Sequence, residues 1–304
     1  MKGLKLNQLQ MLLAVADAGG FSAAAAELGC TQSRISHAIA ELEAALRTRL
    51  LVRSRTGCVP TDAGHRVIDS AREILRLTQG LVETAQASTA LGGQVRIACF
   101  RSVSTHILPP ALAALAREYP NIRIDIDDGF EDRDGITQAI EAGRAELGIA
   151  QLPIAEGWVA HALAADDYVL VAPTAWGLAM PVSWSQLGER PYIQLDCAGA
   201  RLLLEQCQAA GFAPRLSRTL KTDSSIAALV QQGLGYSILP RLALFPIPAG
   251  VTVLDLPIPA KRHFALVARP EVARREAVRT VVRFIRDQRL GSCNAAFRAG
   301  LFSW

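Results

Sequence analysis

The chain has 304 residues, of which 50% are hydrophobic and 20% charged, with a formal net charge of +4 at pH 7. This length and apolar content predict a folded protein of two or more domains and exclude a disordered chain. No uninterrupted apolar run is long enough to cross a bilayer, and the start MKGLKLNQLQ lacks the apolar core of a signal peptide. We therefore expect a cytoplasmic protein with no membrane partner. Six scattered cysteines without paired zinc-ligand spacing indicate neither a disulfide framework nor a metal site.

The first 60 residues have the pattern of short helices joined by tight turns. Asn7 followed by Gln10 is a capping-box pattern, and the helix that it begins should end at Gly19. Ser22 is expected to cap a second helix, whose four consecutive alanines would let a neighbouring helix approach closely. Gly29 then supplies the left-handed residue that ends this helix.

The third helix should begin after Thr31, a favourable N-cap residue. Its apolar residues fall on one face, at spacings of four, three and four: Ile35, Ile39, Leu42 and Leu46. The opposite face carries short hydrogen-bonding side chains near the helix start: Gln32, Ser33, Ser36 and His37. Compact donors and acceptors at the start of the second helix of a helix-turn-helix suit the reading of base edges in the DNA major groove. The alternative is a polar, solvated face on a small helical domain.

A basic segment follows directly. Between Ala44 and Thr61 the chain has four arginines and no acidic residue. Its apolar and β-branched residues on both sides of Thr56-Gly57 predict a small hairpin wing, with Arg53 and Arg55 placed to reach a phosphate or the minor groove. A run of charge is often only a solvated face. Because this one adjoins a helix-turn-helix pattern, a DNA contact is favoured.

A helix of nearly thirty residues should then begin at Thr61. Val67, Ile74 and Leu81 recur every seven residues, and a second column of Ile68, Leu75 and Val82 runs beside them. Such heptads are typical of a coiled-coil seam, although packing against the distal half of the chain is an alternative. The pattern favours a symmetric dimer, which would bind a pseudo-palindromic operator in double-stranded DNA.

Beyond Gly92-Gly93, strand-like and helix-like segments alternate. The strands VRIACF, IRIDID and AELGIA are separated by helical patterns, and a second similar unit follows the crossing segment DDYVLVAP. The chain returns through HFALVAR to a C-terminal helix. This alternation predicts two α/β units in succession.

The stretch FSAAAAELGCTQSRISHAIAELEAALRTRLLVR, followed by PTDAG, resembles the N-terminal domain of LysR-type transcriptional regulators. The resemblance implies an α plus α/β protein: a winged helix-turn-helix over residues 1–61, a dimerisation helix over 62–91 and an effector-binding domain over 92–304. That domain would consist of two Rossmann-like subdomains of periplasmic-binding-protein type, the first formed by about 92–161 and 266–304 and the second by about 162–265.

The resemblance also implies a sequence-specific regulator of transcription, dimeric or tetrameric, with RNA polymerase as a further partner that the family allows. It places the DNA-binding positions at Ser22, Thr31, Gln32, Ser33, Ser36, His37, Arg53 and Arg55. Three residues depart from the family pattern. Arg47 stands where the family usually has glycine, Leu51 where it has an aromatic residue, and His37 where Arg or Lys is frequent.

A small-molecule effector is expected in the cleft between the two subdomains, where strand ends and helix starts can hold an anion. The candidate positions are Ser102, Ser104, Thr105, Gly129, Phe130, Cys197, Thr222 and Asp223. Simple helix capping is the alternative for the hydroxyl residues.

Thiol-based redox sensing is an alternative within the same family. Cys207 falls where peroxide-sensing members keep a redox cysteine, and Cys197 lies ten residues before it. An enzyme is not expected, because the chain has no GxSxG, HExxH, P-loop or GxGxxG motif; we predict no catalytic residue and no cofactor. A free solute-binding protein would have no use for the first 91 residues.

Overall fold

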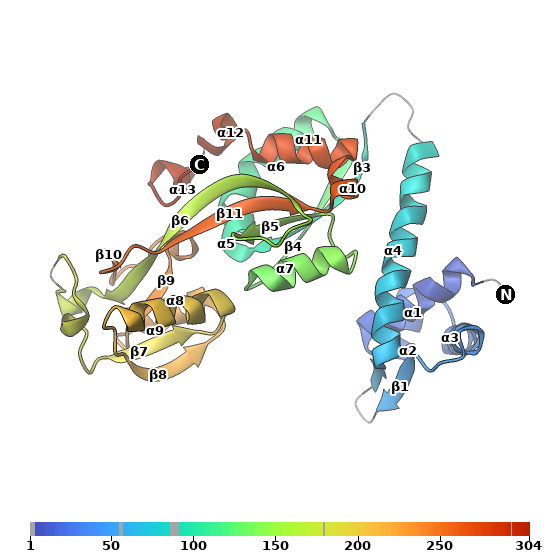
Figure 1. Cartoon of the computed structure of the whole chain (residues 1–304), viewed down its shortest axis with the longest axis horizontal. Coiled ribbons are helices and arrows are strands. Elements are labelled where there is room, and N and C mark those ends of the chain that lie inside the picture. The colour runs from blue at the N-terminus through green and yellow to red at the C-terminus, as the bar shows by residue number, and fades with distance from the viewer. Residues whose placement is uncertain (1–3, 55–56, 86–90, 179, 293) are drawn as a thin grey trace. The chain divides into compact units, whose positions relative to one another are not determined.

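The computed structural model describes residues 4–54, 57–85, 91–178, 180–292 and 294–304. The chain divides into two compact units (Figure 1). One comprises Met1–Ala90 with Glu141–Arg144, and the other comprises Leu91–Ile140 with Ala145–Trp304. The predicted change of texture near Gly92 thus falls at the boundary between the units.

The N-terminal unit contains helices and one hairpin. Its elements are α1 (Leu6–Ala18), α2 (Phe21–Glu27), α3 (Gln32–Leu46), β1 (Leu51–Ser54), β2 (Gly57–Pro60) and α4 (Asp62–Ala85). The strands β1 and β2 pair antiparallel, with Leu51 opposite Pro60. Ile35, Ile39 and Leu42 are buried in a core shared with α1, α2 and the first half of α4, so the predicted apolar face of α3 is confirmed.

Two predicted helix caps are wrong by two residues each. The N-cap of α1 is Lys5, whose backbone amide donates to Gln8 Oε1 at 3.0 Å, so the reciprocal bond does not involve Asn7 and Gln10. Helix α2 begins at Phe21 after an extended Gly20, which places Ser22 inside the helix. The predicted cap of α3 is confirmed, because the Thr31 hydroxyl accepts a hydrogen bond from the Arg34 amide at 3.3 Å.

The distal unit is built around a seven-stranded sheet in the order β10-β6-β11-β5-β3-β4, with β9 also paired to β6. The strands are β3 (Gly93–Phe100), β4 (Ile122–Phe130), β5 (Leu147–Gln151), β6 (Val159–Pro173), β9 (Ser237–Pro240), β10 (Val251–Asp255) and β11 (Lys261–Ala268). A separate parallel pair consists of β7 (Pro191–Leu195) and β8 (Arg215–Leu220). The helices are α5 (Arg101–His106), α6 (Leu108–Glu118), α7 (Arg133–Glu141), α8 (Ala198–Ala209), α9 (Asp223–Gln231), α10 (Pro270–Ala273), α11 (Glu276–Ile285), α12 (Gln288–Ser292) and α13 (Ala295–Arg298).

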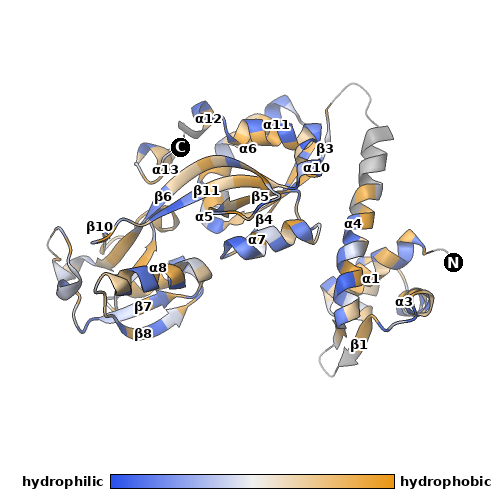
Figure 2. Ribbon diagram, in the orientation of Figure 1, coloured by the Kyte–Doolittle hydropathy of each residue, from blue (hydrophilic) through white to orange (hydrophobic). Residues whose placement is uncertain are grey.

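This unit has two α/β subdomains joined by long strands. In the first, β3 pairs parallel with β4 and β5, and β11 closes the sheet antiparallel. The second contains β7, β8 and β9 with α8 and α9. The long strand β6 pairs with β11 over its first part and with β9 and β10 over its second, so it belongs to both subdomains (Figure 1). Figure 2 shows hydrophobic residues concentrated along β5, β6 and β11, as expected for strands covered on both faces.

Among the described residues, no single helix has the length and apolar character to cross a membrane. Helices α1 and α2 meet these criteria only when taken together, across a bend of 116°. Both contribute buried side chains to the core of the N-terminal unit.

Candidate functional site

The polar face at the start of α3 is open to solvent. Gln32, Ser33 and His37 are exposed, and Ser36 is half-buried. Ser22 Oγ, from α2, donates to Gln32 Oε1 at 3.3 Å, which ties the two helices together on this face. His37 Nε2 lies 3.2 Å from Glu41 Oε1 one turn further along α3. The face therefore presents donors and acceptors without bulky side chains, as base-edge reading requires.

The hairpin is anchored to the end of α3. Glu43 Oε1 accepts hydrogen bonds from the amides of Leu50 at 2.7 Å and Leu51 at 3.2 Å. Between Glu43 and Leu50 the chain turns at Arg47. The φ of Arg47 is 54°, a left-handed value that is unusual for a residue other than glycine. Arg53 lies in β1, but its side chain and the whole of Arg55 lie outside the described residues. The structure thus places the hairpin beside α3 and leaves the positions of these two guanidinium groups as a prediction.

Helix α4 has two apolar sides. Ile68 and Ala71 are buried in the core of the N-terminal unit, where Val67 and Leu75 also pack. Ile74 and Leu77 are 40% and 56% exposed. The side chains of Leu81 and Val82 lie outside the described residues. One predicted heptad column therefore serves the unit's own core, while Ile74 and Leu77 form an apolar surface along the same helix.

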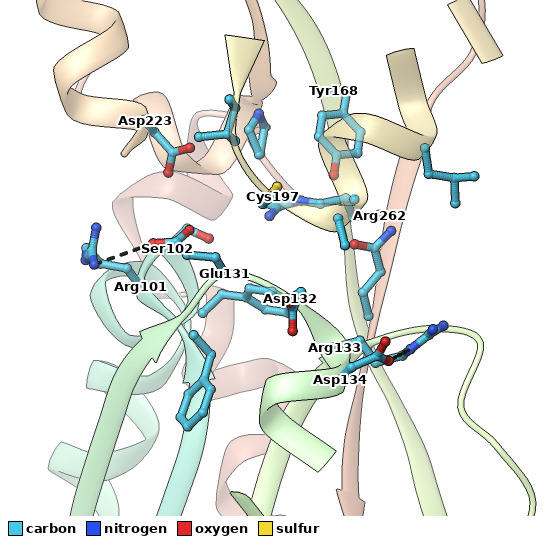
Figure 3. A pocket seen from close by; sticks show the side chains of 18 of the residues that line it. Arg101, Ser102, Glu131, Asp132, Arg133, Asp134, Tyr168, Cys197, Asp223 and Arg262 are labelled. Atoms are coloured by element: carbon cyan, nitrogen blue, oxygen red, sulfur yellow. Dashed lines mark hydrogen bonds and ion pairs between the residues drawn. The ribbon is translucent and has the colours of Figure 1, made fainter. Parts of the chain in front are cut away.

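A cavity of about 150 Å³ lies in the cleft between the two subdomains of the distal unit (Figure 3). The first subdomain contributes residues at the end of β4 and the start of α7. The second contributes Cys197 and Gly199 at the start of α8 and Asp223 at the start of α9. Tyr168 and Arg262 come from β6 and β11, the strands that join the subdomains. A ligand in this cavity would touch both halves of the unit and the connection between them.

The arginines that line the cavity each have an acidic partner. Arg262 is 5% exposed and makes two hydrogen bonds to the buried Asp166, at 2.8 and 2.7 Å. Arg133 Nε donates to Asp134 Oδ1 at 3.0 Å, and Arg101 Nη2 lies 3.7 Å from Glu131 Oε1 (Figure 3).

The lining carboxylates are not all matched in the same way. Asp132 accepts the amide of Gly135 at 2.7 Å and so caps α7. Within the described part of the chain, Asp223 has no hydrogen-bonded or ion-paired partner. Burial raises its pKa above the ordinary aspartate value, against the lowering effect of Arg262 and Arg101.

The hydroxyl groups of two largely buried residues also open into the cavity. Ser102 is 8% exposed and Tyr168 is 7% exposed, and neither hydroxyl has a hydrogen-bond partner among the residues that the structure describes. Burial raises the pKa of Tyr168 to about 12, so its hydroxyl stays protonated and can donate. A side chain on Gly199 would meet Tyr168 Oη at 3.2 Å and Gln151 Oε1 at 3.6 Å, so glycine lets these groups reach the start of α8.

The two cysteines of the redox hypothesis lie at opposite ends of α8. Cys197 is the N-cap residue, and its sulfur accepts the amide of Ala200 at 3.4 Å. Cys207 is fully buried in the second subdomain, where burial raises its pKa to about 11. Burial also raises the pKa of Cys197. Neither site lowers a thiol pKa, which is what a reactive cysteine requires.

Comparisons with known proteins assign both units. Residues 6–65 match the bacterial regulatory helix-turn-helix proteins of the lysR family, and residues 88–289 match the LysR substrate binding domain. A probable HTH-type transcriptional regulator, LrrA, from Synechococcus elongatus is 39% identical over 262 residues, covering 85% of this chain and 88% of that protein. The chain belongs to the LysR family. It is a LysR-family transcriptional regulator with an effector-binding domain.

Other relatives and structures agree with this assignment. A probable hydrogen peroxide-inducible genes activator from Streptomyces viridosporus is 31% identical over 247 residues, covering 79% of this chain and 78% of that protein. A full-length OxyR from Pseudomonas aeruginosa has a TM-score of 0.69 at 20% identity, covering 97% of this chain and 99% of that one. The LysR-family regulator CbnR has the same TM-score at 22% identity, covering 94% and 99%. These two structures share the fold of this LysR-family chain.

The structure brings four of the eight expected effector positions to the cavity: Ser102, Phe130, Cys197 and Asp223. The other four make local contacts outside the lining. Ser104 Oγ lies within hydrogen-bond distance of two acceptors, the Arg101 carbonyl and Asp128 Oδ2, and can donate to either. Thr105 Oγ1 donates to the Arg101 carbonyl. The Gly129 amide donates to Asp127, and Thr222 Oγ1 donates to Ser225 Oγ. Ser102, Ser104 and Thr105 lie within α5 rather than before it, because the helix begins directly at the end of β3.

Sequence reasoning missed most of the charged lining. The run Glu131–Asp134 follows the end of β4 directly, and charged residues just beyond a parallel strand are a recognisable signal of a site. Tyr168 and Arg262 gave no such signal, since each lies within a strand pattern. Arg34, exposed in the first turn of α3, is a further basic residue beside the predicted DNA-binding positions.

Proposed function

We propose that this LysR-family regulator binds double-stranded DNA with α3 in the major groove. Gln32, Ser33, Ser36 and His37 would face base edges or nearby phosphates, while Ser22 and Thr31 support the helix start. The observation that carries this proposal is the compact, exposed polar face of α3 beside a hairpin that Glu43 anchors. Arg53 and Arg55 would contact the backbone. In agreement, full-length CbnR, 22% identical to this chain, has been crystallised in a complex with its target DNA.

The dimer that we propose uses the apolar surface of α4. Ile74 and Leu77 are exposed although they are large and apolar, and Leu81 follows at heptad spacing from Ile74. Burying such a surface against a second copy is favourable, and the two-fold symmetry would match a pseudo-palindromic operator. Val67 packs against the unit's own core and would lie at the edge of the seam. Two dimers could further pair into a tetramer, and RNA polymerase would be the partner in activation.

A small molecule in the cleft would set the activity. The cavity is lined by residues of both subdomains and of the strands that connect them. A ligand that contacts both subdomains at once would favour the arrangement of the subdomains in which it binds most tightly. We propose no catalytic role and no cofactor for the lining residues. We place the protein in the cytoplasm, because a regulator of transcription acts on DNA.

Thiol sensing is the weaker candidate. It is supported by relatives named as hydrogen peroxide-inducible genes activators. Against it, a helix advances about 1.5 Å per residue, which separates Cys197 and Cys207 by about 15 Å along α8. Disulfide formation requires Cα atoms within about 7 Å, so α8 would have to unwind. Both thiols also have raised pKa values.

The test of DNA reading compares Gln32→Ala with Gln10→Ala, a matched change at an exposed glutamine on α1. Gln32→Ala should weaken operator binding by about 1 to 3 kcal/mol and leave binding to random DNA unchanged. Gln10→Ala should alter neither. Fluorescence anisotropy with both DNA types at one salt concentration measures this. Equal losses on both DNAs would mean that Gln32 does not read a base.

A further inference from the structure

The charges that line the cleft indicate which chemical class of effector it binds. This inference rests on the proposed effector site. Each lining arginine is occupied: Arg262 by Asp166, Arg133 by Asp134 and the Pro153 carbonyl, and Arg101 by Glu131. The guanidinium groups, which would otherwise hold an anionic ligand, are therefore already neutralised.

Asp223 is the charge left over. It lies at the start of α9, and Figure 3 shows its carboxylate on the side of the cleft that faces Arg101 and Glu131. The described residues give it no hydrogen-bonded or ion-paired partner. Burial raises the pKa of Glu131, and the negative charge of Asp223 raises it further. Arg262 and Arg101 lie near enough to lower the pKa of Asp223, but each makes its ion pair with another carboxylate. A carboxylate in a partly desolvated cleft without an ion-paired cation of its own is therefore favourably placed to bind a positive group.

The two unpartnered hydroxyls complete the site. Ser102 and Tyr168 are more than nine-tenths buried and open into the same cavity as Asp223. Their hydroxyl groups make no hydrogen bond to the described residues and line the cavity, so they are available to a polar ligand there. They can donate to an acceptor on the molecule whose positive group Asp223 binds.

We propose that the effector is a small molecule with a protonated amine, which binds Asp223 and neighbouring Glu131 while an acceptor group meets the hydroxyls of Ser102 and Tyr168. An α-amino acid has both features. This differs from the anionic effector expected from the sequence, because the lining arginines are paired within the protein. The amine would draw α9 of one subdomain toward β4 of the other, which couples binding to closure of the cleft.

The affinity should depend on pH in a definite direction. A bound cation favours the ionised form of Asp223, so binding lowers its raised pKa, and affinity falls as the pH drops through the unliganded value. The groups that act electrostatically with Asp223 come from every surrounding element: Arg101, Glu131, Asp166, Tyr168, Cys197 and Arg262. Of these, Glu131 also has a raised pKa and adds to the same trend.

Isothermal titration calorimetry of the full-length protein tests the proposal. The probes are the twenty common L-amino acids and 1,4-diaminobutane, each amino acid matched by the carboxylic acid that lacks its amino group. The variants are Asp223→Asn and, as a matched control, Asp167→Asn, which removes a half-buried carboxylate of β6 outside the cavity. At least one amine should bind, its deaminated partner should not, and Asp223→Asn should weaken binding by about tenfold or more. Asp167→Asn should bind as wild type.

The contrary results separate two failures. Binding of the deaminated acids instead of the amines, with loss in Gly199→Trp, would overturn the amine proposal and keep the cleft as the effector site. Amine binding unchanged in Asp223→Asn would also overturn it. The amine proposal also fails if none of the probes binds, or if Gly199→Trp does not weaken the binding of any of them. If, in addition, Gly199→Trp leaves regulation of a reporter promoter unchanged, the effector site itself lies elsewhere.

Discussion

The buried ion pair between Asp166 and Arg262 should hold the cleft together at the joint of its subdomains. The two residues face each other across β6 and β11 and are 2% and 5% exposed. Asp166 also accepts the Leu242 amide at 3.1 Å. Removing one member of such a pair leaves the other charge buried, which costs about 3 to 5 kcal/mol. Asp166→Asn should fall near the lower end, because Asp223 still lies near the guanidinium of Arg262.

Urea unfolding measured by tryptophan fluorescence can isolate this effect. All four tryptophans lie beyond residue 91, so their emission reports on the distal unit. The control is Asp167→Asn, which breaks the exposed contact with Lys261 one register position away and should cost less than about 1 kcal/mol. The double variant Asp166→Asn/Arg262→Met should be less destabilised than the sum of its single variants. If Asp166→Asn costs no more than Asp167→Asn, the pair does not stabilise the joint.

Three further outcomes follow from the N-terminal unit. Arg47→Gly should raise the free energy of unfolding of that unit by about 1 kcal/mol, because Arg47 has the left-handed φ of 54° that glycine adopts without strain; circular dichroism during denaturation would show no gain if the strain is absent. Ile74→Asp should shift sedimentation toward the monomer, since it places a charge in the proposed seam, and wild-type sedimentation would locate the seam elsewhere. Arg53→Ala should flatten the salt dependence of DNA binding by about one unit of log–log slope if Arg53 contacts a phosphate, and an unchanged slope would contradict that contact.

The helix-turn-helix could be predicted because its signals are local. Thr31, Gly29 and the apolar spacing of α3 each act within one or two turns, and the structure confirms them. The N-caps at Lys5 and Gly20 are harder to predict. Neighbouring residues can cap a helix almost equally well, and tertiary packing determines which of them does so.

Most of the cleft could not be predicted, because its residues are brought together by contacts between segments distant in the sequence. Asp166 and Arg262 are 96 residues apart and meet only because β6 and β11 pair in one register. The sequence predicts the hydroxyls after the first strand as one group of candidate positions. Only Ser102 lines the cavity, because α5 begins directly after β3 and turns Ser104 and Thr105 toward local acceptors. The direction in which each of these side chains points depends on the residue at which the helix begins, which the sequence alone does not specify.

Sequencing the DNA fragments that the full-length protein retains from the genome that encodes it tests the central claim most directly. We predict enrichment of a pseudo-palindromic sequence whose half-sites lie about 10 base pairs, or a multiple of that, apart. Gln32→Ala combined with Ser36→Ala should abolish this enrichment while the protein still binds DNA without sequence preference. Fragments spread evenly over the genome for the wild-type protein, or the same enriched sequence for the double variant, would contradict the reading of DNA by α3.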